Sequence, residues 1–99
     1  MSRSELVVLA KEIHERILDK IEKHETFYAA LYTEKTEMSV RFTPESINVY
    51  DDAYEIIDEF DSSIHIKKNE VIHIYKDDEI DGSYYFINFK NGSQMIIIL

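Results

Sequence analysis

The sequence predicts an α+β fold in which a long N-terminal helix packs on an antiparallel β-sheet, with a short acidic helix before a C-terminal β-meander. Apolar residues recur every three or four positions in the first part of the chain, the spacing of an amphipathic helix. From residue 63 onward, short apolar runs are separated by turn residues, a pattern typical of strands. A chain of 99 residues with 44% hydrophobic content has room for one modest core, so we expect a single domain over residues 1–99.

The N-terminal helix is predicted over residues 4–23. Ser2 and Glu5 have the spacing of a capping box, which satisfies free amide groups at the start of a helix. Glu12 precedes Arg16 by four residues, an order that stabilises exposed helices. The apolar stripe of this helix consists of Leu6, Leu9, Ala10, Ile13, Ile17 and Ile21.

The middle of the chain allows more than one interpretation. Residues 25–33 fit a helix or a strand. Residues 39–42 and 46–49 alternate polar and apolar side chains around the turn 43–46, which favours a hairpin in which Pro44 presets the turn. A competing helix would begin at Pro44 and end at Asp61. The hairpin is preferred, because Asp52 and Glu55 have a second capping-box spacing that would begin a short acidic helix later. Its buried side would consist of Ile56, Ile57 and Phe60.

Four strands are predicted after residue 61, over residues 63–67, 71–76, 83–89 and 94–99. Asn91-Gly92 is a strong signal for a two-residue hairpin turn. That turn would place Phe89 opposite Gln94 and Tyr85 opposite Ile98. Both faces of this C-terminal hairpin are apolar, so each requires a cover. The long helix covers one face, which leaves the other for the short helix, the first hairpin or another subunit.

The charge distribution is uneven along the chain. Residues 1–50 hold nine acids and seven Lys or Arg, whereas residues 51–99 hold eleven acids and four Lys, which divides the net charge of −9 into −2 and −7. Such a surface repels nucleic acid and anionic membranes and attracts basic proteins. The chain contains no cysteine, no apolar segment of membrane-spanning length and no signal-peptide pattern, so we expect a cytoplasmic protein.

Two acidic segments are the predicted partner-binding residues. Carboxylates along a rigid surface imitate the phosphates of a nucleic acid and fit a basic groove. The alternative for each segment is an ordinary solvated surface. The second segment partly matches a calcium loop, but the twelfth position is Asn88 where a bidentate glutamate is needed. The predicted binding residues are Asp51, Asp52, Glu55, Asp58, Glu59 and Asp61 in the first segment, and Asp77, Asp78, Glu79 and Asp81 in the second.

No catalytic or cofactor site is predicted. His65 and His73 are expected to face each other across two paired strands, but a zinc site needs at least a third protein ligand, and the spacing indicates none. Ser62 and Ser63 lie near His65 in sequence, yet a catalytic triad needs side chains from separate elements. With only Gly82 and Gly92 in the chain, a glycine-rich phosphate loop is excluded.

These observations predict a non-enzymatic binding protein. In composition alone, the chain resembles the small acidic inhibitors that phages and mobile elements use against host nucleases. The leading hypothesis is therefore an inhibitor that occupies the basic groove of a larger nucleic-acid-binding protein, without binding nucleic acid or membranes itself. The alternative is a structural or regulatory subunit that forms a homodimer through its apolar C-terminal hairpin.

Overall fold

The computed structural model describes residues 3–99 and has an α+β fold, which confirms the predicted class. Within these residues one α-helix, α1 (Arg3–Lys23), is followed by eight strands and one short 3₁₀ turn, η1 (Lys68–Glu70). The strands are β1 (Phe27–Tyr32), β2 (Glu37–Phe42), β3 (Pro44–Val49), β4 (Ala53–Asp58), β5 (Ser63–Lys67), β6 (Val71–Glu79), β7 (Gly82–Phe89) and β8 (Gln94–Ile98).

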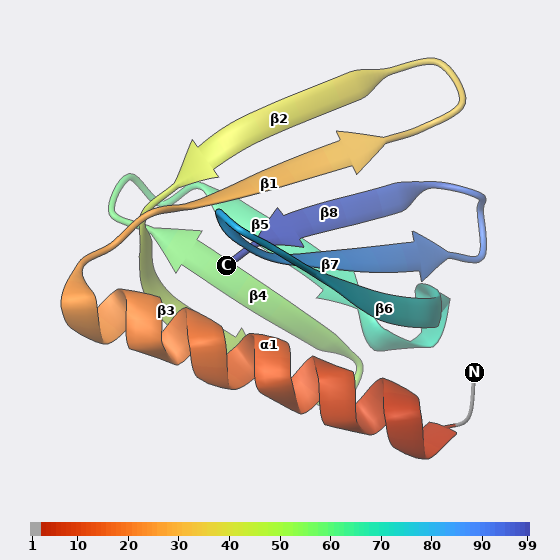
Figure 1. Ribbon diagram of the computed structural model, residues 1–99, viewed down its shortest axis with the longest axis horizontal. Coiled ribbons are helices and arrows are strands. Elements are labelled where there is room, and N and C mark those ends of the chain that lie inside the picture. The colour runs from red at the N-terminus through yellow and green to blue at the C-terminus, as the bar shows by residue number, and fades with distance from the viewer. Residues whose placement is uncertain (1–2) are drawn as a thin grey trace.

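The strands form two antiparallel sheets (Figure 1). The five-stranded sheet has the order β2-β1-β8-β7-β6, and the three-stranded sheet has the order β3-β4-β5. In Figure 1, α1 runs below both sheets, and it contacts β3 in one sheet and β6 in the other. The core therefore lies between α1, the three-stranded sheet and one face of the five-stranded sheet.

The predicted helix is confirmed, and its apolar stripe faces the core. Ile13 and Ile17 are buried, and the rest of the stripe packs around them partly buried. The helix ends at Lys23, and the next residue, His24, has a positive φ of 56° that lets the Glu25 amide donate to the Lys20 carbonyl at 2.9 Å. The predicted capping box lies partly outside the described residues, because Ser2 is not among them.

Residues 25–33, for which the sequence left helix and strand open, contain β1. It forms a hairpin with β2, closed by the Thr33 amide donating to the Thr36 carbonyl at 2.9 Å. The predicted hairpin between residues 39–42 and 46–49 is therefore wrong, although both segments are strands. Only Thr43 separates β2 from β3, and one residue is too short for a hairpin loop. The chain changes sheets at this point, and Pro44, which has no N–H group, begins the new strand.

The predicted short acidic helix is also wrong, as is the competing helix from Pro44 to Asp61. Residues 53–58 form β4, the central strand of the three-stranded sheet. The segment contains Tyr54, Ile56 and Ile57, and aromatic and β-branched residues favour strands. A helix confined to about ten residues is also marginal. Pairing with strands on both sides outweighs the capping-box spacing of Asp52 and Glu55.

The four predicted C-terminal strands are confirmed, but the register of the last hairpin differs by one residue. Asn88, rather than Phe89, lies opposite Gln94, and Tyr85 lies opposite Ile97 rather than Ile98. The loop has three residues, with the Gly92 amide donating to the Phe89 carbonyl at 3.0 Å. Gly92 alone has a positive φ, 86°, whereas a two-residue primed turn would require one at Asn91 also. The outcome is a turn with a glycine bulge.

A polar contact fastens α1 to the five-stranded sheet. The hydroxyl of the buried Tyr85 donates to Glu12 Oε2 at 2.6 Å, and Lys76 Nζ lies 3.2 Å from the same oxygen. The Tyr85 hydrogen bond and the nearby Lys76 ammonium hold the pKa of the Glu12 carboxyl below its ordinary value. Burial, and then the bond to Glu12, raises the pKa of Tyr85. The contact thus favours an ionised Glu12 and a neutral Tyr85.

This contact predicts a pH dependence of stability. Because the pKa of Glu12 is lower in the folded chain, its stabilising effect is complete above its ordinary value of 4.5 and disappears as the pH falls through the folded value. We expect Glu12→Gln to lower the free energy of unfolding by about 1 kcal/mol at neutral pH, since Glu12 is partly exposed. Urea unfolding at pH 7 and pH 3 checks this, because the difference from the native chain should shrink at pH 3. An unchanged difference would contradict it.

The five-stranded sheet has an inner face in the core and an outer face without a cover. Along β7, Tyr85 and Ile87 point inward and are buried, whereas Tyr84 and Phe86 point outward and stay partly exposed. Within residues 3–99, none of the side chains packed in or against the core comes from the outer face. Within these residues the outer face of the C-terminal hairpin is thus uncovered, and the requirement for a further cover stays a prediction. Neither the short helix nor the first hairpin supplies it.

Candidate protein-interaction surface

The fold divides the ten predicted binding acids among different places. Asp51 and Asp52 lie in the loop where β3 ends and β4 begins, and Asp58 lies at the other end of β4. Six strand residues, about 20 Å, separate these groups. Glu55 lies between them and is partly occupied, because it accepts from Asn48 Nδ2 at 3.3 Å and its other oxygen lies 3.8 Å from His65 Nδ1. The first acidic segment is therefore not one continuous carboxylate array.

The other seven acids gather at one end of the molecule. Phe42 ends β2, and only Thr43 separates it from Pro44, which pairs with Asp58 at the end of β4. Phe42 also pairs with Phe27, at the end of the five-stranded sheet where β8 ends and the β6–β7 turn lies. Figure 1 shows both turns, and the C-terminus, at the left of the view. Glu59–Asp61 and Glu79–Asp81 therefore leave the fold at the same end.

The first of these turns, between β4 and β5, is ordered by its own acid. Asp58 Oδ1 accepts from the amides of Phe60, at 2.9 Å, and Ser62, at 2.8 Å. The backbone of Asp61 adopts a positive φ of 63°. This conformation leaves the side chain of Phe60 79% exposed between Glu59 and Asp61. The prediction that Phe60 is buried is wrong, because the helix that would have turned it inward does not form.

The second turn, between β6 and β7, is also held by hydrogen bonds to its own acids. Asp78 accepts from Ser83 Oγ at 2.7 Å, which holds the pKa of its carboxyl below the ordinary value. The Tyr84 hydroxyl donates to Asp81 at 3.1 Å, and this bond raises the pKa of Tyr84. Between Glu79 and Asp81 the side chain of Ile80 is fully exposed, at 108% of its reference area. Hydrogen bonds at the base of the turn thus support an apolar tip.

The two turns present the same triplet, an acid, a large apolar residue and an acid. We call Glu59-Phe60-Asp61 and Glu79-Ile80-Asp81 the acidic tips. Phe60 and Ile80 are the most exposed large apolar side chains among residues 3–99. The acids of both tips are among the residues predicted from the sequence, whereas Ile80 is not. The sequence does contain a signal for its exposure. Ile80 lies between two acids and close to Gly82, so it has no adjacent apolar residue of the kind that accompanies a buried strand position.

The structure contradicts the predicted histidine pair. His65 lies on β5 in the three-stranded sheet, opposite Glu55, whereas His73 lies on β6 in the five-stranded sheet, opposite Asn88. The intervening residues form η1 and carry the chain from one sheet to the other, so no hairpin joins the two strands. Within the described part of the chain, no group of three or more His, Cys, Asp or Glu is placed to hold a metal ion.

The comparisons with known proteins add no functional information. No family model, curated protein or solved structure matches this chain. Among residues 3–99, no helix has the length and apolar character needed to cross a membrane.

Proposed function

We propose that this protein is a non-enzymatic inhibitor that inserts its two acidic tips into the basic groove of a larger nucleic-acid-binding protein. The observation that carries the proposal is the repeated triplet, which exposes Phe60 and Ile80 at one end of the fold between pairs of carboxylates. A partner that covers two large exposed side chains gains about 25 cal/mol for each Å² of apolar surface that it buries. The flanking acids select a basic partner and direct its approach.

The arrangement suits a groove that normally holds nucleic acid. Such grooves are lined by Lys and Arg that contact phosphates, and carboxylates occupy the same positions. The four acids of the tips supply the charge, and the two apolar side chains supply contacts that a phosphate backbone lacks. In this proposal the protein meets its target in the cytoplasm. It belongs to the class of inhibitors that phages and mobile elements direct against host nucleases.

Affinity capture from a host-cell lysate tests the proposal. The immobilised native chain is compared with a charge variant, in which Glu59→Gln, Asp61→Asn, Glu79→Gln and Asp81→Asn are combined, and with an apolar variant, Phe60→Ala with Ile80→Ala. A matched control combines Asp51→Asn and Asp52→Asn, which removes acids at the other end of β4. We expect the native chain and the control to recover a nucleic-acid-binding protein at low salt.

Both tip variants should lose this partner, and 1 M salt should release it, because exposed charges are screened within about 3 Å at that concentration. Truncating an anchoring side chain at the centre of an interface lowers affinity by about 30-fold or more. The recovered partner should also lose its nucleic acid when native protein is added. Equal loss of capture in the Asp51 and Asp52 control, or capture that persists at high salt, would contradict the proposal.

A second candidate function is self-association through the outer face of the five-stranded sheet. Strand β8 is central in this sheet, so a two-fold axis along β8 would stack two copies with β6 over β2. In such a dimer, Asp77 would lie over Arg41 of the second copy, because both residues are level with Ile98 in the strand registers. The same operation places Phe86 over Ala30 and His73 over Glu37. Side chains of opposite charge would therefore face each other across the axis, and large side chains would face small ones.

A charge exchange tests this candidate. We expect Arg41→Asp or Asp77→Arg alone to weaken the dimer about tenfold, because each places like charges opposite each other, and the double variant to restore it. Sedimentation equilibrium over a range of protein concentrations measures all four chains. A native chain that stays monomeric at high concentration, or a double variant weaker than either single one, would contradict self-association through this face.

A further inference from the structure

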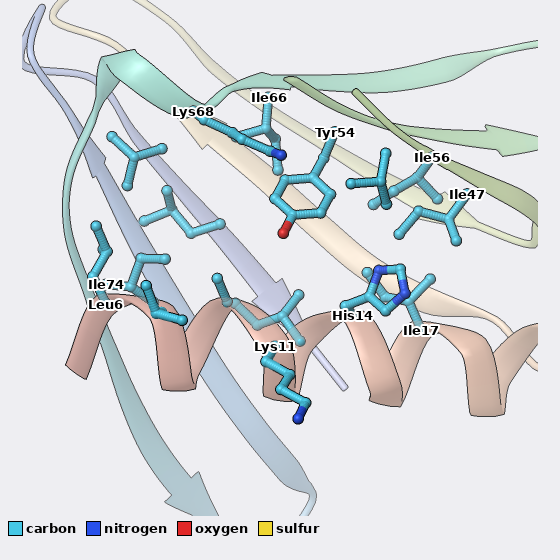
Figure 2. A pocket seen from close by; sticks show the side chains of 16 residues that line it. Leu6, Lys11, His14, Ile17, Ile47, Tyr54, Ile56, Ile66, Lys68 and Ile74 are labelled. Carbon is cyan, nitrogen blue, oxygen red and sulfur yellow. The ribbon is translucent and has the colours of Figure 1, made fainter. Parts of the chain in front are cut away.

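A large apolar cavity lies between α1 and the two sheets (Figure 2). Its volume is about 680 Å³, within the range of about 300–1,000 Å³ that small-molecule sites occupy. Ala10 and Ile17 of α1 form one wall. The facing walls include Ile56 and Ile66 of the three-stranded sheet and Ile74 and Ile87 of the five-stranded sheet. The helix and strands of both sheets thus meet around one apolar space.

The polar side chains at this cavity are basic or neutral. The described lining contains Lys11, His14, Tyr54 and Lys68 but no acid, although the chain has twenty acids and only eleven Lys or Arg. The ordinary composition of this surface would place carboxylates there more often than lysines. Because carboxylates are excluded from the lining, the cavity favours a negatively charged group. The acidic tips, at the opposite end of β4, favour a positively charged one.

Lys68 and Tyr54 are placed to receive such a group. Lys68 Nζ lies 4.7 Å from the centre of the Tyr54 ring and donates to the Tyr50 carbonyl at 2.5 Å. None of the ion pairs found within residues 3–99 involves Lys68. Figure 2 shows the Tyr54 hydroxyl pointing into the space between β4 and α1, with His14 on the facing helix. His14 Nδ1 is buried and has no hydrogen-bond partner.

We infer that this cavity binds a single-chain amphiphile with an anionic head, of which a fatty acid is the simplest. The apolar walls take the hydrocarbon chain, because burying each methylene group is favourable and needs no directed contact. The head group lies beside Lys68, where the ammonium group, the Tyr54 hydroxyl and the imidazole of His14 supply donors to a carboxylate. The site is separate from the acidic tips, so it does not depend on the proposed inhibitor function.

Calorimetric titration with octanoate, decanoate and decanol tests the inference. A chain that enters the cavity should gain about fourfold in affinity per methylene group, so decanoate should bind about 16-fold more tightly than octanoate. Decanoate should also bind more tightly than decanol, which lacks the charge. Ala10→Phe places a large ring in the cavity and should abolish binding of both ten-carbon compounds.

Lys68→Met keeps the length of the side chain and removes its charge. It should weaken decanoate binding about tenfold and leave decanol binding unchanged. The matched control is Lys67→Met, since Lys67 is the adjacent exposed lysine and does not line the cavity. Absence of saturable binding by the native chain, unchanged decanoate binding in Ala10→Phe, or equal effects of the two lysine variants would each overturn the inference. The chain-length and Ala10 results decide the case independently if Lys68→Met fails to fold.

Discussion

Replacing Ile97 by alanine is expected to lower the free energy of unfolding by about 2–5 kcal/mol, the cost of removing a buried isoleucine side chain. Ile97 lies on β8 and is completely buried, at 0% exposure. It is paired with Ala29 of β1 on one side and Tyr85 of β7 on the other, at the centre of the five-stranded sheet. The residues around it are held in paired strands, so they have little freedom to close the space that the substitution leaves.

Ile98→Ala is the matched control for this prediction. Ile98 follows Ile97 on the same strand but points to the outer face and remains partly exposed. Its replacement should cost about 1 kcal/mol, the scale of strand propensity alone. Urea unfolding at low protein concentration measures both variants without a contribution from self-association. A larger effect for Ile98 than for Ile97 would contradict the register of the β7–β8 hairpin.

The N-terminal helix was predictable because its pattern is long and local. Six apolar residues at helical spacing extend over the whole segment, and no strand pattern competes with them. The four C-terminal strands were predictable for a related reason, since apolar runs between turn residues recur there. In both cases the information lies within a few residues of the position that is predicted.

The partners of the strands were much less predictable. A two-residue alternation shows which side chains share a face but does not identify the neighbouring strand. The segments at residues 39–42 and 46–49 have equally good patterns, yet they belong to strands β2 and β3, which join different sheets because Thr43 alone separates these two strands. Asn91-Gly92 predicted a hairpin correctly, but the extra loop residue before Gly92 shifted the register by one. Only tertiary pairing decides such cases.

The candidate surface was predictable in its chemistry but not in its shape. The excess of acid after residue 50 is visible in the sequence. The predicted strands 71–76 and 83–89 left residues 77–82 as a turn, whereas Asp77–Glu79 extend β6 and only Ile80 and Asp81 form the turn. A helix would have kept Asp52 and Asp58 about 9 Å apart along its axis, whereas a strand extends the separation to about 20 Å. This one difference in local structure splits the first acidic segment between the two ends of β4. It also exposes Phe60 and so creates the first acidic tip.

The second acidic tip depends on the glycine that follows it, and Gly82→Ala is expected to lower the free energy of unfolding by about 1–3 kcal/mol. Gly82 has a φ of +151°, which a residue with a side chain rarely adopts. A Cβ atom at this position would also lie 3.1 Å from the Leu99 carbonyl oxygen. That oxygen already accepts from the Ser83 amide at 2.9 Å, so it is not free to move away.

Gly92→Ala separates these two contributions. Gly92 also has a positive φ, 86°, but no atom lies within 4 Å of the position that its Cβ would occupy. It should therefore show only the conformational cost, about 1 kcal/mol, and thermal or urea unfolding should rank Gly82→Ala as the more harmful change. Because Gly82 positions Asp81 and Ile80, Gly82→Ala should also weaken partner capture, whereas Gly92→Ala, at the opposite end of β7, should not. Equal stability losses would show that the approach to Leu99 is relieved without cost, and equal capture would show that the tip does not need this turn.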